Sequence, residues 1–66
     1  MQITVNGETR DVADGLAVAG LLETLGVPRQ ATAVEVNRDL VPRSEHARHV
    51  LADGDAVEIV TLVGGG

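Results

Sequence analysis

The sequence predicts a small α+β domain in which a mixed sheet of about five strands packs against one helix. A strong hairpin signal stands near the start of the chain, and a single amphipathic helical pattern follows it. The richest run of β-branched residues comes last, at residues 56–63. The elements are therefore expected in the order β-β-α-β-β-β within one domain, residues 1–63.

The first two strands are predicted to form a hairpin around Asn6-Gly7. Residues 2–5 alternate polar and apolar side chains, with Ile3 and Val5 on one face, and residues 8–12 read as the returning strand. Both positions of a two-residue hairpin turn need a positive φ, which Asn and Gly tolerate.

One helix is predicted from an apolar stripe of helical period, formed by Val18, Leu21, Leu22 and Leu25. We expect this stripe to cover the sheet and not a partner, because no other segment could form a helix long enough to do so. Asp14 or Gly15 is expected to begin the helix, and Gly26 followed by Pro28 to end it. Gly20, in mid-helix, suggests close approach to a strand.

Two short strands are predicted next, at residues 33–36 and 40–41, separated by a turn at 37–39. Pro42 ends the second of them and suits a sheet edge because it lacks a ladder donor. Residues 43–49 are polar and irregular, with at most one helical turn, and Asp53-Gly54-Asp55 forms a tight turn before the last strand.

The last strand has two different faces. Glu58 is expected to face solvent, which places Val57, Ile59, Thr61 and Val63 on the face that the helix covers. Val60 and Leu62 then share the open face with Glu58, and two large aliphatic side chains there indicate a partner-binding surface that extends to Val63. The alternative is that residues 43–51 cover this strand.

Composition excludes several function classes. The chain has 66 residues, no Cys and no aromatic residue, and its formal net charge is −5. Disulfides and thiolate metal sites are excluded, and nucleic acid or anionic lipid is an unfavourable partner. All five basic residues are Arg. The absence of Lys reflects either coding bias or a benefit to a protein whose activated carboxyl must not meet amines.

His46 and His49 stand three residues apart, with Glu45 beside them. This spacing could hold a metal on one helical face, but no third ligand or strong helix accompanies it. We therefore expect a surface turn and no metal. No nucleophile–base pair or phosphate loop is present in the sequence, which predicts a co-substrate and not an enzyme.

The chain ends in Gly64, Gly65 and Gly66 directly after the last strand. Glycine has no Cβ, so such a flexible tail fits a channel too narrow for side chains and leaves the terminal carboxyl unhindered. That carboxyl is an anion at neutral pH and can attack the α-phosphate of ATP in a partner enzyme. An inert, frayed terminus is the alternative.

Taken together, these segments resemble the sulfur carriers of thiamine biosynthesis, the ThiS family of the ubiquitin-like β-grasp class. The resemblance covers essentially the whole chain, and its motifs are Ile3-Thr4-Val5-Asn6-Gly7, Val18-Ala19-Gly20-Leu21-Leu22 with Leu25-Gly26, Val34-Glu35-Val36-Asn37, Val41-Pro42-Arg43-Ser44, Asp53-Gly54-Asp55 with Val57-Glu58-Ile59-Val60, and Val63-Gly64-Gly65-Gly66. It implies a β-grasp fold with the first strand parallel to the last. His46 departs from the family, in which an aromatic residue is expected.

The resemblance also implies a function. An E1-like, ATP-using enzyme (ThiF-type) would adenylate the Gly66 carboxylate, and sulfur from a cysteine desulfurase would convert it to a thiocarboxylate. Gly64, Gly65 and Gly66 would then enter thiazole synthase (ThiG-type) and donate sulfur to the thiazole ring. The carrier itself binds no cofactor; ATP and a persulfide are used by its partners.

Two other functions stay open at this point. One is a sibling sulfur carrier for molybdopterin, tRNA thiolation or cysteine synthesis, and the other is a β-grasp interaction module with an inert tail. In each case we expect a cytoplasmic protein that has no membrane segment and is monomeric when isolated.

Overall fold

The computed structural model describes residues 1–61. Its elements are β1 (Gln2–Val5), β2 (Glu8–Asp11), α1 (Val18–Leu25), the 3₁₀ turn η1 (Arg29–Ala31), β3 (Thr32–Val36), β4 (Asp39–Val41), the 3₁₀ turn η2 (Arg43–Glu45) and β5 (Ala56–Thr61). The predicted order of strands and helix is confirmed. The returning strand ends one residue earlier than predicted, and the third strand begins one residue earlier.

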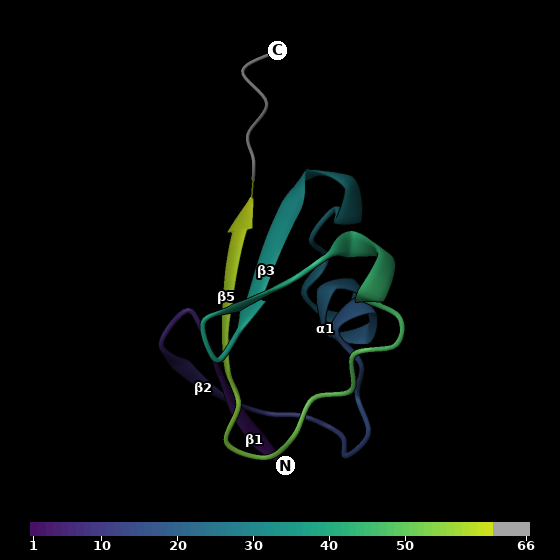
Figure 1. Cartoon of the computed structure of the whole chain (residues 1–66). Helices are drawn as coiled ribbons and strands as arrows, with labels where there is room; N and C mark the ends of the chain where they lie inside the picture. Colours follow the sequence, from purple (N-terminus) through teal and green to yellow (C-terminus); the bar gives the residue numbers. More distant parts are fainter. Residues whose placement is uncertain (62–66) are drawn as a thin grey trace.

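The five strands form one mixed sheet in the order β2-β1-β5-β3-β4. β1 runs parallel to β5, whereas the β1–β2, β3–β4 and β3–β5 pairs are antiparallel. The last strand of the chain is therefore the central strand of the sheet. Figure 1 shows α1 packed on one side of β5 and β3, with no helix on the other side. This is the β-grasp arrangement that the family resemblance implied.

Both hairpins turn through residues with positive φ. Asn6 and Gly7 have φ of 50° and 86°, as the first hairpin signal predicted. Asn37 and Arg38 have φ of 51° and 72° between β3 and β4. Two consecutive positive φ values match the right-handed twist of the flanking strands, so each turn fixes the register of its hairpin.

The beginning of α1 differs from the prediction. The helix begins at Val18 after Ala17 and has no side-chain cap. Instead, the backbone N–H groups of Val18 and Ala19 donate to the carbonyl oxygens of His49 (2.9 Å) and His46 (2.8 Å). Asp14 and Gly15 precede the first helical residue by three or more positions and do not cap the helix. Its first N–H donors are instead satisfied by a main-chain segment from elsewhere in the fold. Ala17 also forms an isolated antiparallel bridge with Val50.

The end of α1 is as predicted. Gly26 has a φ of 71°, its N–H donates to the carbonyl of Glu23 at 3.1 Å, and the N–H of Val27 donates to that of Leu22 at 3.0 Å. This is a Schellman motif, for which glycine is favoured. The explanation predicted for Gly20 is wrong: a Cβ there would meet the Leu16 side chain at 2.8 Å, not a strand.

A continuous apolar core lies between α1 and the sheet. It consists of ten buried residues, namely Ile3, Val5, Val18, Leu21, Leu22, Val34, Val36, Val41, Leu51 and Val57. The helix contributes three of them, and Leu25 packs partly buried against the rest. The predicted stripe therefore covers the sheet. With eight residues, α1 is too short to cross a membrane, and residues 1–61 contain no other helix that could.

His46 is buried, so the prediction of a surface turn is wrong for it. Its side chain is 1% exposed, and its Nε2 lies 3.1 Å from the carbonyl oxygen of Val41. Because a carbonyl only accepts, Nε2 carries the proton and donates, while Nδ1 has no partner. His46 is thus a buried residue at the position where the family resemblance led us to expect an aromatic ring. Within the described part of the chain, no three His, Cys, Asp or Glu residues gather as metal ligands.

Candidate functional site: the strand that leads to the C-terminus

The candidate site is built on β5, the strand that leads into the glycines. β5 pairs with β1 on one side and with β3 over five residue pairs on the other. Val60 is the one predicted partner-binding residue in the described range. Leu62, Val63, Gly64, Gly65 and Gly66 lie outside residues 1–61, as does the predicted domain boundary at residue 63.

The two faces of β5 alternate as the sequence predicted. Val57 is buried and Ile59 half-buried on the α1 side, whereas Glu58 and Val60 are exposed on the open side. Val60 is 57% exposed, so residues 43–51 do not cover it and that alternative is wrong. Thr61 was predicted to be covered by the helix but is exposed, because it lies at the end of the sheet opposite Thr32.

Asn37 holds the beginning of β5. Its side chain accepts from the N–H of Ala56 through Oδ1 (3.0 Å) and donates through Nδ2 to a carboxylate oxygen of Asp55 (3.0 Å). The other carboxylate oxygen of Asp55 accepts from the N–H of Ala52 at 2.8 Å. The predicted turn at Gly54, which has a φ of 87°, is thereby tied to the β3–β4 turn.

Asn6 holds the second half of β5. β1 pairs with β5 only as far as Val57, so the backbone groups of Ile59 have no strand partner on that side. The Asn6 side chain replaces one: Oδ1 accepts from the Ile59 N–H at 2.7 Å, and Nδ2 donates to the Ile59 carbonyl at 3.1 Å. The sequence explains Asn6 only as a turn residue. The Asn side chain carries the same donor and acceptor as a backbone amide, whereas Gly, which the turn would also accept, has neither. This difference is the signal in the sequence that could have indicated a second role for Asn6.

We expect Asn6→Gly to loosen β5 without opening the hairpin. Glycine keeps the positive φ, so the turn survives, but both hydrogen bonds to Ile59 are lost. At about 0.5–1.5 kcal/mol per hydrogen bond, the free energy of unfolding should fall by roughly 1–3 kcal/mol. Denaturant unfolding measures this loss, and amide hydrogen exchange should show faster exchange at Ile59.

The matched variant for this test is Asn6→Asp. It retains an acceptor for the Ile59 N–H and puts a carboxylate oxygen in place of the donor to the Ile59 carbonyl, so protection of the Ile59 amide should lie nearer the wild-type value. If Ile59 exchanges at the wild-type rate in Asn6→Gly, the side chain does not hold the strand.

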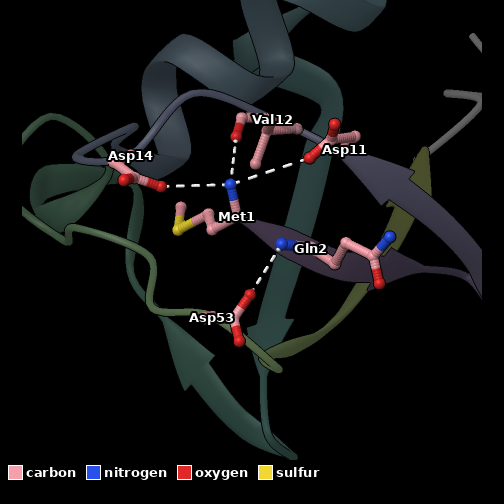
Figure 2. A network of polar contacts seen from close by, with 6 residues as sticks. All are labelled: Met1, Gln2, Asp11, Val12, Asp14 and Asp53. Carbon is pink, nitrogen blue, oxygen red and sulfur yellow. Dashed lines mark hydrogen bonds and ion pairs between the residues drawn. The ribbon is translucent and has the colours of Figure 1, made fainter.

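The opposite end of the sheet is fastened through the N-terminus (Figure 2). The Met1 ammonium donates to the Val12 carbonyl (2.8 Å) and to Asp14 Oδ1 (3.0 Å), and it lies 3.7 Å from Asp11 Oδ1. Beside it, the N–H of Gln2 donates to Asp53 Oδ1 at 2.7 Å. The hydrogen bond that the ammonium donates to Asp14, aided by the negative charges of Asp11 and Asp53, raises the pKa of the Met1 amine above its ordinary value of 8.0, even though desolvation opposes the shift.

This amine predicts a simple dependence of stability on pH. Because its pKa is raised in the folded chain, the ammonium contributes stability below about pH 8 that is lost as the pH rises through the raised pKa. The chain has no Cys, Tyr or Lys, so no other side-chain type with a reference pKa from about 8 to about 11 is present. The melting temperature should therefore fall as the solution is taken above pH 8.

Asp14→Asn provides the control for that decline. It removes the strongest partner of the ammonium, so the variant should melt earlier at neutral pH and lose less on going to alkaline pH. If the melting temperatures of the variant and the wild type fell by the same amount above pH 8, Asp14 would not be the cause of the pH dependence.

A shallow surface hollow lies on the helix side of the molecule. It is lined by Glu23, Val27, Gln30 and Arg43. These side chains offer one acid, one base and an amide, but neither a nucleophile nor a general base placed to activate one. The hollow therefore does not alter the prediction of a carrier.

Comparison with known proteins places the chain in a family. The family model described as "ThiS family" matches residues 3–66. The sulfur carrier protein ThiS of Escherichia coli is 35% identical, with both chains covered completely. A crystal structure of the thiamine biosynthesis protein ThiS from Geobacter metallireducens superposes with a TM-score of 0.85 and 38% identity, and again both chains are covered completely.

A longer relative has a different name. The thiazole synthase of Paramagnetospirillum magneticum is 42% identical over all 66 residues, yet the chain spans only 20% of that protein. A segment similar to this chain thus occurs within a thiazole synthase, which links the two kinds of protein. The β-grasp fold, the resemblance and the role of a non-enzymatic sulfur carrier for thiamine biosynthesis are confirmed at the level of the family. The chain belongs to the ThiS family.

Proposed function

We propose that the Gly66 carboxylate is the group that carries sulfur. The observation that supports this most directly is that the family model matches through residue 66 and so includes the three terminal glycines. A purely structural β-grasp module would need only the strands and helix. Chemistry at the terminal carboxylate explains why the last three residues are glycines. Glycine has no side chain, so no atom larger than hydrogen hinders access to the reacting carbon.

The chemistry needs three steps on partner enzymes before the sulfur can be donated. A carboxylate oxygen of Gly66 attacks the α-phosphorus of ATP, and pyrophosphate leaves to give an acyl-adenylate. The terminal sulfur of a persulfide then attacks the acyl carbon, and AMP leaves with the electron pair of the broken C–O bond. A thiol finally cleaves the S–S bond, forming a disulfide with the persulfide's inner sulfur and releasing the thiocarboxylate. The ionised thiocarboxylate is a nucleophile that donates sulfur to the thiazole precursor.

The described residues contribute position. Asn37 fixes the beginning of β5 and Asn6 fixes Ile59, so the strand is held from both neighbours shortly before the glycines. The position of β5, and so of its end at Thr61, is therefore fixed relative to a partner that docks on the sheet. Binding energy from the folded domain can then be used to orient the reacting carboxylate.

Three partners follow from this proposal. An E1-like adenylating enzyme supplies ATP, a cysteine desulfurase supplies the persulfide sulfur, and thiazole synthase accepts the sulfur. The similarity to a segment of a thiazole synthase supports the last of these, since joining a carrier to the enzyme that accepts its sulfur raises their effective concentration. Val60, with Leu62 and Val63 beyond it, is the proposed contact surface.

Intact-mass spectrometry tests the proposal. The chain is incubated with the E1-like enzyme of its own organism, ATP, a cysteine desulfurase and cysteine, and its mass is compared with that of a sample lacking ATP. Replacement of one terminal oxygen by sulfur is expected. An unchanged mass, under conditions that load the Escherichia coli relative with its own enzymes, would refute it. A thiamine requirement after loss of the gene assigns the pathway.

A further inference from the structure

Two like charges lie opposite each other at the centre of the open face. Glu35 on β3 and Glu58 on β5 are directly paired in the sheet register, and both side chains are exposed. Opposed residues on neighbouring strands have Cβ atoms about 4.5–5.5 Å apart, and like charges in such a pair are destabilising. The register thus places two like charges on neighbouring strands in the middle of the sheet, an arrangement that is unfavourable in the free domain.

Within residues 1–28 and 30–61, no basic side chain forms an ion pair with either glutamate. The ion pairs of these two ranges join Met1 to Asp11 and Asp14, and Arg48 to Glu45. None of them includes Glu35 or Glu58. The pair therefore remains available to a cation from outside the chain.

Exposed aliphatic side chains flank the acidic pair. Leu40, 66% exposed, lies opposite Glu35 on the edge strand β4. Val60, 57% exposed, follows Glu58 on the same face of β5 and pairs with Ala33. Only three large hydrophobic side chains of the described region are exposed to this degree, and two of them stand beside these carboxylates. Exposed aliphatic side chains gathered on one face are typical of a protein-binding surface, and arginine is among the residues enriched in such interfaces.

We propose that Glu35 and Glu58 together bind the guanidinium of an arginine on the protein that docks on this face, with Leu40 and Val60 packing around it. This inference rests on the proposed function, because the docking protein is one of the enzymes that act on Gly66. A guanidinium has five donors in a planar fork and can bridge two carboxylates, whereas a lysine ammonium offers a single point of charge. Binding it converts the repulsion of the free domain into attraction in the complex.

A second copy of the chain does not fit this surface. Two copies meeting face to face would bring two acidic pairs together, and each copy already has a formal net charge of −5. Charge complementarity therefore favours a basic partner and disfavours self-association.

The test measures binding and stability on the same variants. Glu35→Gln, Glu58→Gln and the double variant are titrated against the E1-like enzyme and against thiazole synthase of the same organism, at low and at high salt. Glu8→Gln is the matched control, because it removes one charge from an exposed position on β2, away from the paired glutamates. The double variant should bind at least one of the enzymes about tenfold more weakly, with a smaller salt dependence, while Glu8→Gln stays within about twofold.

Thermal unfolding distinguishes a binding role from a structural one. Since the pair is unfavourable in the free domain, its neutral variants should melt at the wild-type temperature or above it. Wild-type affinity of the double variant for both enzymes would overturn the inference, and so would dimerisation of the wild type through this face. If the wild type loads sulfur normally and the double variant binds normally, only this inference fails. If the wild type neither binds nor loads, the proposed function fails with it.

Discussion

Deletion of Gly66 should abolish sulfur loading and leave the folded domain unchanged. The reacting group in the proposed mechanism is one carboxylate, and removing a residue withdraws it from the catalytic groups of the partner by about 3.3–3.6 Å. A displacement of about 1 Å can cost about a hundredfold in rate, so a whole residue should bring loading below detection. Intact mass after incubation with the partner enzymes measures loading, and thermal unfolding reports the fold.

One added residue after Gly66 provides the matched control. It retains all three glycines and a free carboxylate but moves that carboxylate in the opposite direction, and it too should prevent loading. Gly66→Ala keeps the length and adds only a methyl group, so it should slow loading without eliminating it. If the shortened or the lengthened chain acquires sulfur at the wild-type rate, loading does not depend on where the carboxylate lies, and the role proposed for Gly66 is wrong.

Leu22→Ala should remove a large part of the stability of the domain. Leu22 is fully buried where α1 meets the sheet, and truncating such a leucine typically costs about 2–5 kcal/mol. A chain of this size is expected to have a total stability of only about 3–10 kcal/mol. Denaturant unfolding should show a large decrease in the midpoint, and part of the population should be unfolded without denaturant.

Leu40→Ala is the same chemical change at an exposed position. The Leu40 side chain is 66% exposed on the edge strand, so the truncation should change the free energy of unfolding by less than about 0.5 kcal/mol. The difference in the free energy of unfolding between the two variants thus distinguishes a core leucine from one on the exposed docking face. Equal destabilisation by the two substitutions would contradict the packing described here.

Local sequence signals predicted most of the fold. Asn6-Gly7 defined its turn because a positive φ is a property of these residues themselves. The apolar stripe of α1 and its end at Gly26 are likewise contained within a few turns of chain. The parallel pairing of β1 with β5 joins residues about fifty positions apart and came from the family resemblance, because periodicity does not specify which strands become neighbours.

What the sequence did not reveal depends on contacts between distant segments. The carbonyls of His46 and His49, in the segment that follows β4 along the chain, accept from the first N–H groups of α1, so no cap near Asp14 is needed. His46 looks polar in the sequence, yet its ring is buried and its Nε2 donates to the carbonyl of Val41, a contact that the local sequence does not reveal. The hydrogen bonds from Asn6 to Ile59 cross 53 positions, and only the three-dimensional pairing of the strands makes them visible.

The parallel pairing of β1 and β5 also separates the two ends at which an amide bond could form. Met1 carries the one primary amine in this chain, and it lies at the end of the sheet where β5 begins, not where β5 ends at Thr61 (Figure 1). Its carbonyl and carboxylate partners hold it as an ammonium, which has no lone pair for attack. Under the proposed function, two features would protect an adenylated Gly66 from head-to-tail cyclisation. The strand directions keep the Met1 amine away from the end of β5, and protonation of that amine prevents it from attacking the acyl carbon.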